Sequence, residues 1–96
     1  MVFWGMEVQP GELSVCPMIR RGAKIYITQA TLGDGPTEEK CILLCAGGRL
    51  RTPPIFLCSL PAGRKDSCPL NLEIDDEVIF SVAGERSIHI SGFVRE

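Results

Sequence analysis

Apolar residues occupy every second position over most of this chain, and this period of two restricts the fold more than any other feature of the sequence. In the opening stretch Val2, Trp4, Met6 and Val8 alternate with other residues, so a strand there has one strongly apolar face. Further segments rich in Ile, Val, Phe and Thr have the same strand character. The expected strands cover residues 2–8, 24–32, 40–46, 54–60, 69–74, 77–83 and 87–94, with a weaker one at 13–16.

Short runs of turn-forming residues, such as QPGE, AGGR and AGER, separate the expected strands. No segment carries the apolar stripe of an amphipathic helix. The chain has 96 residues, of which 45% are hydrophobic and 23% charged, and this is enough for one modest core. We therefore expect a single all-β domain over residues 1–96, built as a sandwich or small barrel.

Two of the expected strands, 40–46 and 54–60, are apolar on both faces. In the second of them, Ile55 and Leu57 are expected to face away from Phe56, Cys58 and Leu60. A sandwich has one inner core, so solvent, a folded terminus or another subunit must meet the second face. We favour another subunit. Phe3 points away from the face that holds Trp4, and a neighbouring subunit, a sheet-mate or a loop could cover it. The expected subunit contacts are Phe3, Ile42, Leu44, Ile55 and Leu57.

Residues for catalysis or metal binding are sparse. A nucleophile needs a nearby base, but His89 is the single histidine and lies in an alternating strand pattern. Cys41 and Cys45 point the same way from a strand but lie about 13 Å apart, too far for a shared zinc. The glycine-rich runs do not continue into a phosphate-binding motif. We expect no catalytic residue, no metal and no cofactor.

The charge and cysteine usage restrict the partners and the compartment. A net charge of −2 and a pI near 5.4 argue against sequence-specific DNA binding and favour a basic partner. The first residues lack the pattern of a secretory signal, and no run reaches the roughly 18 apolar residues of a membrane span. Five cysteines without an export signal are expected to be reduced thiols in the core.

Carboxylates gather in two expected turns. An isolated acidic turn is most often a solvated corner, and nothing beside these residues would raise a carboxyl pKa for acid catalysis. As candidate contacts to a basic partner, the first turn offers Glu73, Asp75, Asp76 and Glu77, and the second offers Asp34, Glu38 and Glu39.

Three segments, FWGMEV, TLGDGPTEEK and AGERSIHISGFV, resemble the recurrent signatures of the nucleoplasmin-like core domain, in the same order and with similar spacing. The stretches ITQATLGDG, CPLNLE, DEVIFSV and RSIHISGF are especially similar to the amino-terminal domain of plant nuclear immunophilins, which are tacrolimus-binding prolyl isomerases. A plant type of histone deacetylase with a nucleoplasmin-like front end is the close alternative. Where that group has a histidine proposed to act in deacetylation, this chain has Tyr26.

The resemblance implies an eight-stranded jelly roll that assembles into a pentameric ring, binds core histones as a chaperone in the nucleus and forms the front module of a longer immunophilin. It also implies that the turn with Asp34, Glu38 and Glu39 corresponds to a loop that can join rings into a decamer. The loop at residues 18–24 is basic here, whereas animal nucleoplasmins can carry an acidic tract there. A purely structural oligomerisation module remains the alternative from a different class.

Overall fold

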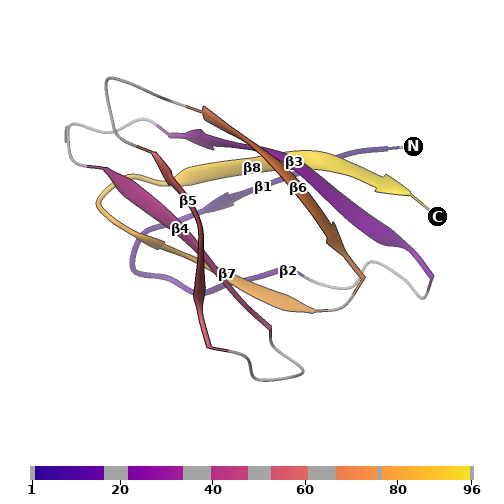
Figure 1. Ribbon diagram of the computed structural model, residues 1–96, viewed down its shortest axis with the longest axis horizontal. Helices are drawn as coiled ribbons and strands as arrows, with labels where there is room; N and C mark the ends of the chain where they lie inside the picture. Colours follow the sequence, from indigo (N-terminus) through magenta and orange to yellow (C-terminus); the bar gives the residue numbers. More distant parts are fainter. Residues whose placement is uncertain are drawn as a thin grey trace.

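The computed structural model describes residues 2–16, 22–33, 40–47, 53–60, 67–75 and 77–95, and these form a two-layered β-sandwich (Figure 1). Eight strands form two four-stranded antiparallel sheets, which confirms the expected all-β, eight-stranded sandwich. The strands are β1 (Val2–Val8), β2 (Ser14–Cys16), β3 (Lys24–Leu32), β4 (Cys41–Gly47), β5 (Ile55–Leu60), β6 (Ser67–Ile74), β7 (Val78–Ala83) and β8 (Ile88–Arg95).

The strand order is β1-β8-β3-β6 in the first sheet and β2-β7-β4-β5 in the second sheet. The chain crosses repeatedly between the sheets, so that strands close in sequence seldom pair and β1 pairs with β8, the last strand. This order gives the sandwich two edges, one formed by β1 and β2 and the other by β5 and β6. In Figure 1, β5 and β6 lie in front of β1 and β2.

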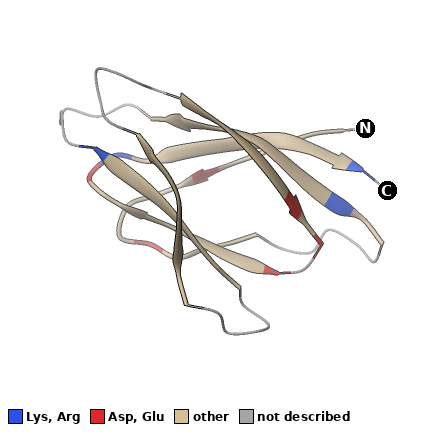
Figure 2. Ribbon diagram, viewed as in Figure 1, with Lys and Arg blue, Asp and Glu red and all other residues tan. Residues whose placement is uncertain are grey.

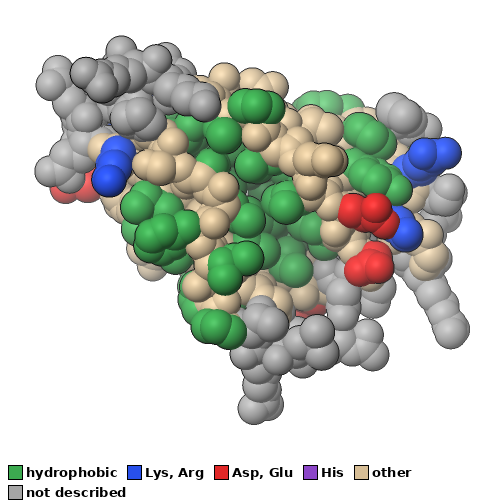
Figure 3. Space-filling model, in the orientation of Figure 1, with side chains coloured by type: hydrophobic (Ala, Val, Ile, Leu, Met, Phe, Trp, Pro, Cys, Tyr) green, Lys and Arg blue, Asp and Glu red, His purple; other side chains and the backbone are tan. Residues whose placement is uncertain are grey.

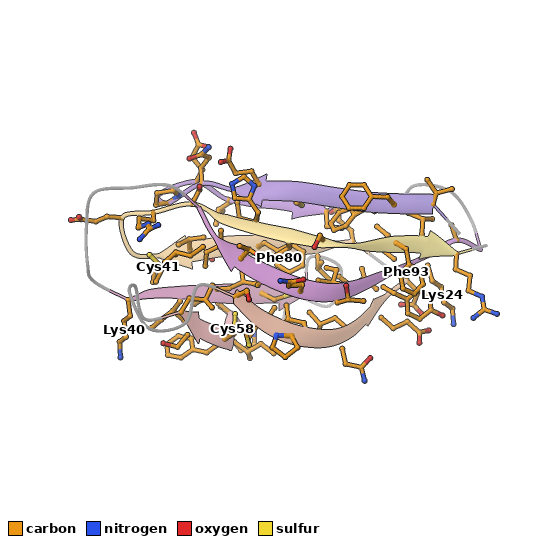
Figure 4. All side chains as sticks on the ribbon, turned by 90° about the horizontal axis from the view of Figure 1, so that it is seen from above. Lys24, Lys40, Cys41, Cys58, Phe80 and Phe93 are labelled. Carbon is orange, nitrogen blue, oxygen red and sulfur yellow. The ribbon has the colours of Figure 1, made fainter. Side chains whose placement is uncertain are left out.

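The core lies between the sheets and follows from the alternation of apolar residues. Phe80 on β7 is fully buried, and Figure 4 labels it within the outline of the strands, away from the rim of the molecule. Closing the two apolar faces over one another removes this surface from water, which is the main stabilising term of the fold. The other fully or almost fully buried large side chains are Val8, Cys16, Ile27, Cys41, Leu43, Leu60, Ile88 and Ile90.

The first strand behaves as its alternation predicts. Trp4 and Met6 are half-buried and pack against the core, and Val8 is fully buried. Phe3 faces outward and is 80% exposed, and its ring lies over Gly5, where an added Cβ would meet Phe3 Cζ at 3.3 Å. The strand therefore belongs to the sandwich from its first residues, because its inner face is tied to the core.

The pairing of β3 with β6 and β8 shifts by one residue between Ile27 and Gln29, which is a β-bulge. Next to this bulge Gly92 of β8 lies against the backbone of β3. A Cβ added to Gly92 would fall within 3 Å of Tyr26 O, Tyr26 C and Ile27 Cα. Only glycine lets the two strands approach this closely.

Hydrogen bonds between two segments that are distant in the sequence join the end of β3 to the start of β8. The Gly33 N–H donates a hydrogen bond to the Ser87 carbonyl at 2.8 Å. The Arg86 guanidinium donates to the Gly33 carbonyl from Nε, at 2.8 Å, and also from Nη2. These contacts give structural roles to residues in two of the three nucleoplasmin-like signature segments.

Candidate histone-binding and self-association surfaces

The acidic turn between β6 and β7 is exposed where the structure describes it. Asp75 follows the last residue of β6 and Glu77 precedes β7, and both are exposed. Figure 2 shows acidic positions near the end of β6 and at the start of β7. The remaining acidic candidates, Asp76, Asp34, Glu38 and Glu39, lie outside the described residues.

Glu73, at the start of this turn, is paired within the subunit. Lys24 Nζ donates a hydrogen bond to Glu73 Oε1 at 2.6 Å, between neighbouring strands of the first sheet. This hydrogen bond, and then the charge of Glu73, raises the pKa of Lys24 above its ordinary value. The pair is about half exposed, so its contribution to stability is small. Its effect is to reduce the negative charge that Glu73 offers to a partner.

The five expected subunit contacts fall into three groups. Phe3 and Ile55 are exposed, with 80% and 58% of their surface accessible. Ile42 and Leu44 are half-buried on the outer face of β4, because their neighbours Cys41 and Leu43 are fully buried on the inner face. Leu57, the fifth, is half-buried and packs against the core.

The expected alternation along β5 is wrong at one point. The pairing of β4 with β5 shifts between Leu43 and Leu44, so that Cys58 lies opposite Leu43 and Phe56 lies opposite Leu44. Leu57 and Cys58 therefore both pack against the core, and Phe56 is 71% exposed. The β-bulge explains the difference, because one extra residue reverses the direction of every side chain that follows it.

The outer face of the second sheet is uncharged in its described part. Its cross-strand pairs join Val15 to Ile79, Ile79 to Ala46, and Leu44 to both Ser81 and Phe56. Figure 2 shows no charged residue along the middle of β4, β5 or β7. This face exposes apolar surface to water, which is unfavourable, so it is a candidate interaction surface.

On the outer face of the first sheet, Tyr26 stacks on Phe93 of the neighbouring strand, with ring centroids 5.1 Å apart and an interplanar angle of 19°. Such a pair contributes about 0.5–1.5 kcal/mol beyond its buried area. The Tyr26 side chain is thus engaged in packing between strands.

Sequence reasoning missed a polar network at the other end of this face. Glu7 Oε2 lies 3.2 Å from His89 Nε2 and accepts a hydrogen bond from Ser87 Oγ at 3.1 Å, while Gln9 Nε2 donates to Glu7 Oε1 at 2.6 Å. In the register of β1 and β8, Glu7 lies directly opposite His89. The sequence alone does not reveal this contact, because it depends on which strands pair. In a serine hydrolase the histidine lies between the serine and the carboxylate. Here the Glu7 carboxylate itself contacts both Ser87 and His89, so the arrangement is not a catalytic triad.

All five cysteines are free thiols, with Cys16 and Cys41 buried and Cys45, Cys58 and Cys68 half-buried. Burial, and then the nearby Cys45, raises the pKa of Cys16 from 9.0 to about 11. Burial also raises the pKa of Cys45. The thiolate is the reactive form, so these two thiols are poor nucleophiles at neutral pH.

We therefore expect Cys16 to resist alkylation by iodoacetamide at pH 8 in the folded protein and to react fully in denaturant, as mapped by peptide mass spectrometry. The half-buried Cys68 serves as the internal comparison. Modification of Cys16 as fast as Cys68 would contradict this. Folding favours the neutral Cys16 thiol, so its contribution to stability is present below pH 9.0 and is lost as pH rises through about 11.

Within the described ranges, no group of three or more His, Cys, Asp or Glu side chains could hold a metal ion. The same residues include no helix with the length and hydropathy needed to cross a membrane.

Comparison with known proteins agrees with this architecture. A family model described as the nucleoplasmin-like domain matches residues 3–95. The peptidyl-prolyl cis-trans isomerase FKBP53 of Arabidopsis thaliana is 47% identical over 97 residues, which cover 98% of this chain and 20% of that protein. The chain thus spans about a fifth of this relative's length.

Among solved structures, the core of Drosophila NLP, whose crystal structure provides insight into pentamer formation and histone binding, matches with a TM-score of 0.83. The match covers all of both chains at 20% sequence identity, a level at which it shows the shared fold. The family match over residues 3–95, the 47% identity to the FKBP53 region and the common eight-stranded sandwich together show that this chain belongs to the nucleoplasmin-like domain family.

Proposed function

We propose that this chain forms a pentameric ring and acts as a histone chaperone, as the amino-terminal module of a nuclear prolyl isomerase. The observation that carries the proposal is the match to the nucleoplasmin-like family over residues 3–95. The similarity to FKBP53 supports the place in a longer isomerase. The domain itself is proposed to have no catalytic activity and no cofactor.

Self-association is supported by the distribution of apolar surface. Phe3, Ile55 and Phe56 are exposed large hydrophobic side chains, and Ile42 and Leu44 lie on the uncharged outer face of the second sheet. Burying these groups between subunits removes apolar area from water at about 25 cal/mol per Å². A contact between two different patches closes into a ring when its rotation permits.

Histone binding is supported by the exposed carboxylates at the turn between β6 and β7. Asp75 and Glu77 lie at exposed positions, and one such turn would be repeated in every subunit of a ring. Several weak contacts on one rigid body combine through effective concentration. Carboxylates attract lysine and arginine without requiring one geometry, which suits a chaperone that must release histones to DNA.

The test replaces the turn carboxylates together, as Asp75→Asn, Asp76→Asn and Glu77→Gln, and titrates core histones at two salt concentrations. Exposed charge pairs contribute up to about 1 kcal/mol each, so we expect affinity to fall about tenfold in physiological salt. Charges are screened over roughly 8–10 Å under these conditions, so wild-type affinity should also fall as salt rises.

The matched control is Glu12→Gln with Glu85→Gln, which removes exposed carboxylates from other turns. It should leave histone affinity within about twofold of wild type, the limit expected for screened distant charges. Light scattering and thermal melting must first show that every variant keeps its assembly and stability. Equal affinity in the turn variant and in wild type would contradict the assignment of the histone site to this turn.

The second candidate is a purely structural module that multiplies the domain following it. The specific observation in its favour is the Lys24–Glu73 ion pair, which reduces the charge of one carboxylate in the proposed histone site. If the isolated domain neither binds histones nor prevents their aggregation on DNA, this second function holds. A deacetylase role has less support, because Tyr26 stacks on Phe93 where the related group has histidine.

A further inference from the structure

Lys24 is a basic residue within the acidic surface that the proposed function assigns to histones. Its Nζ donates a hydrogen bond to Glu73 Oε1 at 2.6 Å. This hydrogen bond and the charge of Glu73, with a smaller effect of Asp75, raise the pKa of Lys24 above its ordinary value. The acidic turn between β6 and β7 therefore already holds a cation that belongs to the same chain.

The register of β3 and β6 explains why Lys24 reaches Glu73. Tyr26 lies directly opposite Glu73, and Ile25 lies opposite Ile74. Lys24 and Tyr26 are two residues apart on one strand, so their side chains point to the same, outer face of the first sheet. Lys24 is thus a diagonal neighbour of Glu73, and a long side chain bridges this spacing.

A fixed aromatic ring lies on the other side of Glu73. Tyr26 stacks on Phe93, with ring centroids 5.1 Å apart, so its ring is held between two neighbouring strands. Glu73 therefore has the Tyr26 side chain directly opposite it and the Lys24 ammonium on its diagonal. A basic group of a partner that approaches this carboxylate has to share it with Lys24 or displace Lys24.

The Lys24–Glu73 pair is accessible to a partner. The side chains of Lys24 and Glu73 are 45% and 48% exposed. Figure 3 shows acidic and basic side chains next to one another at one end of the molecule, the end where β3 begins and β6 ends in Figure 1. Because an exposed ion pair contributes little to stability, it opens at small cost when another cation competes for the carboxylate.

We propose that Lys24 is an internal competitor of the histone at this turn. The proposal rests on the proposed function and adds to it a residue that sets the affinity of the same site. In the free domain the Lys24 ammonium occupies Glu73, and a histone lysine or arginine gains the full charge of that carboxylate only when Lys24 leaves it. This competition lowers histone affinity, and a ring repeats it in every subunit.

Lys24→Gln tests the proposal, because it keeps a long polar side chain and removes the positive charge. We expect histone affinity to rise about three- to fivefold at physiological salt, which is within the range that one exposed charge pair supplies. Fluorescence titration of labelled core histones with the purified domain measures this affinity. Lys24→Arg keeps the charge and should stay within about twofold of wild type.

Lys40→Gln is the matched control for net charge. Lys40 is also exposed, and Figure 4 labels it at the opposite end of the molecule from Lys24. Each of the two glutamine variants removes one positive charge from a chain whose net charge is −2. Since distant charges are screened beyond roughly 8–10 Å, Lys40→Gln should change histone affinity by less than about twofold.

A double-mutant cycle links the expected gain to Glu73. In a Glu73→Gln background the carboxylate that Lys24 occupies is gone, so adding Lys24→Gln should raise affinity by less than about twofold. Light scattering and thermal melting check that each variant keeps the assembly and stability of wild type. We expect no change in either, because both side chains of the pair are largely exposed.

Four results would overturn the proposal. Lys24→Gln would bind histones no more tightly than wild type, Lys24→Arg or Lys40→Gln would show the same gain as Lys24→Gln, or the full gain would persist with Glu73→Gln. Each of these refutes internal competition alone, because wild type still binds histones. A wild-type domain that binds no histones would refute the proposed function, and this proposal with it.

Discussion

Replacing Gly92 with alanine is expected to prevent the domain from folding. The added Cβ would fall within 3 Å of Tyr26 O, Tyr26 C and Ile27 Cα, which are all backbone atoms in the adjacent strand. An extra methyl group in a packed core costs about 1–3 kcal/mol when side chains can shift, and backbone atoms of a paired strand can shift far less. Circular dichroism and urea denaturation of the purified variant would measure the loss.

Gly22→Ala is the matched control for this substitution. Gly22 has a φ of 86°, but an added Cβ would meet no atom of the described residues within 4 Å, its chain neighbours aside. The expected cost is the left-handed conformation alone, about 1–2 kcal/mol. If Gly92→Ala unfolded at the same urea concentration as wild type, β3 and β8 would not approach each other as the structure shows.

Phe80→Ala is expected to give the second large loss, about 3–5 kcal/mol, because it leaves a cavity in the centre of the sandwich. Phe80 is fully buried on β7 and belongs to the core of the sandwich. Domains of this size have about 5–15 kcal/mol of stability in total, so the variant should be close to unfolded at 37 °C. Equilibrium urea denaturation at fixed protein concentration would measure the change.

Phe93→Ala makes the same chemical change at a half-buried position on the outer face of the first sheet. It removes the stacking on Tyr26 but leaves no closed cavity, so we expect a distinctly smaller loss of stability than for Phe80→Ala. Equal losses for the two variants would contradict the burial of Phe80 between the sheets.

The sequence predicted the strands well because each strand has a period-two pattern ended by turn residues. The 24–32 strand is confirmed at both ends, and β8, predicted at 87–94, is shifted by one residue to Ile88–Arg95. The 69–74 strand begins earlier than predicted, at Ser67, because β6 is an edge strand and an edge strand tolerates Pro69 in its interior. The family resemblance supplied the jelly-roll arrangement, and the family comparison and the strand order confirm it.

Features that depend on pairing between strands could not be predicted from local pattern. The bulge opposite Leu43 and Leu44 places Phe56 at the surface, although alternation alone assigns it to the same face as Cys58. The Lys24–Glu73 ion pair joins residues 49 positions apart, so local sequence pattern does not reveal that a lysine partly neutralises one carboxylate of the acidic turn. The close approach at Gly92 likewise depends on the register of β3 and β8.

The apolar outer face of the second sheet could be predicted in part, because it follows from the residue composition of β4. Strand β4 is apolar on both faces in the sequence, and the structure shows its outer residues Ile42 and Leu44 half-buried on an uncharged face. The histone-binding and subunit contacts remain predictions, since both require a second molecule.

Light scattering of the purified domain at micromolar concentration tests the central claim, self-assembly through apolar surfaces, most directly. The account predicts five copies of the 10.5 kDa chain in one particle of about 52 kDa. The mass should be the same in low and high salt, because apolar contacts are not weakened by screening. A 10.5 kDa monomer at both ionic strengths would contradict the account.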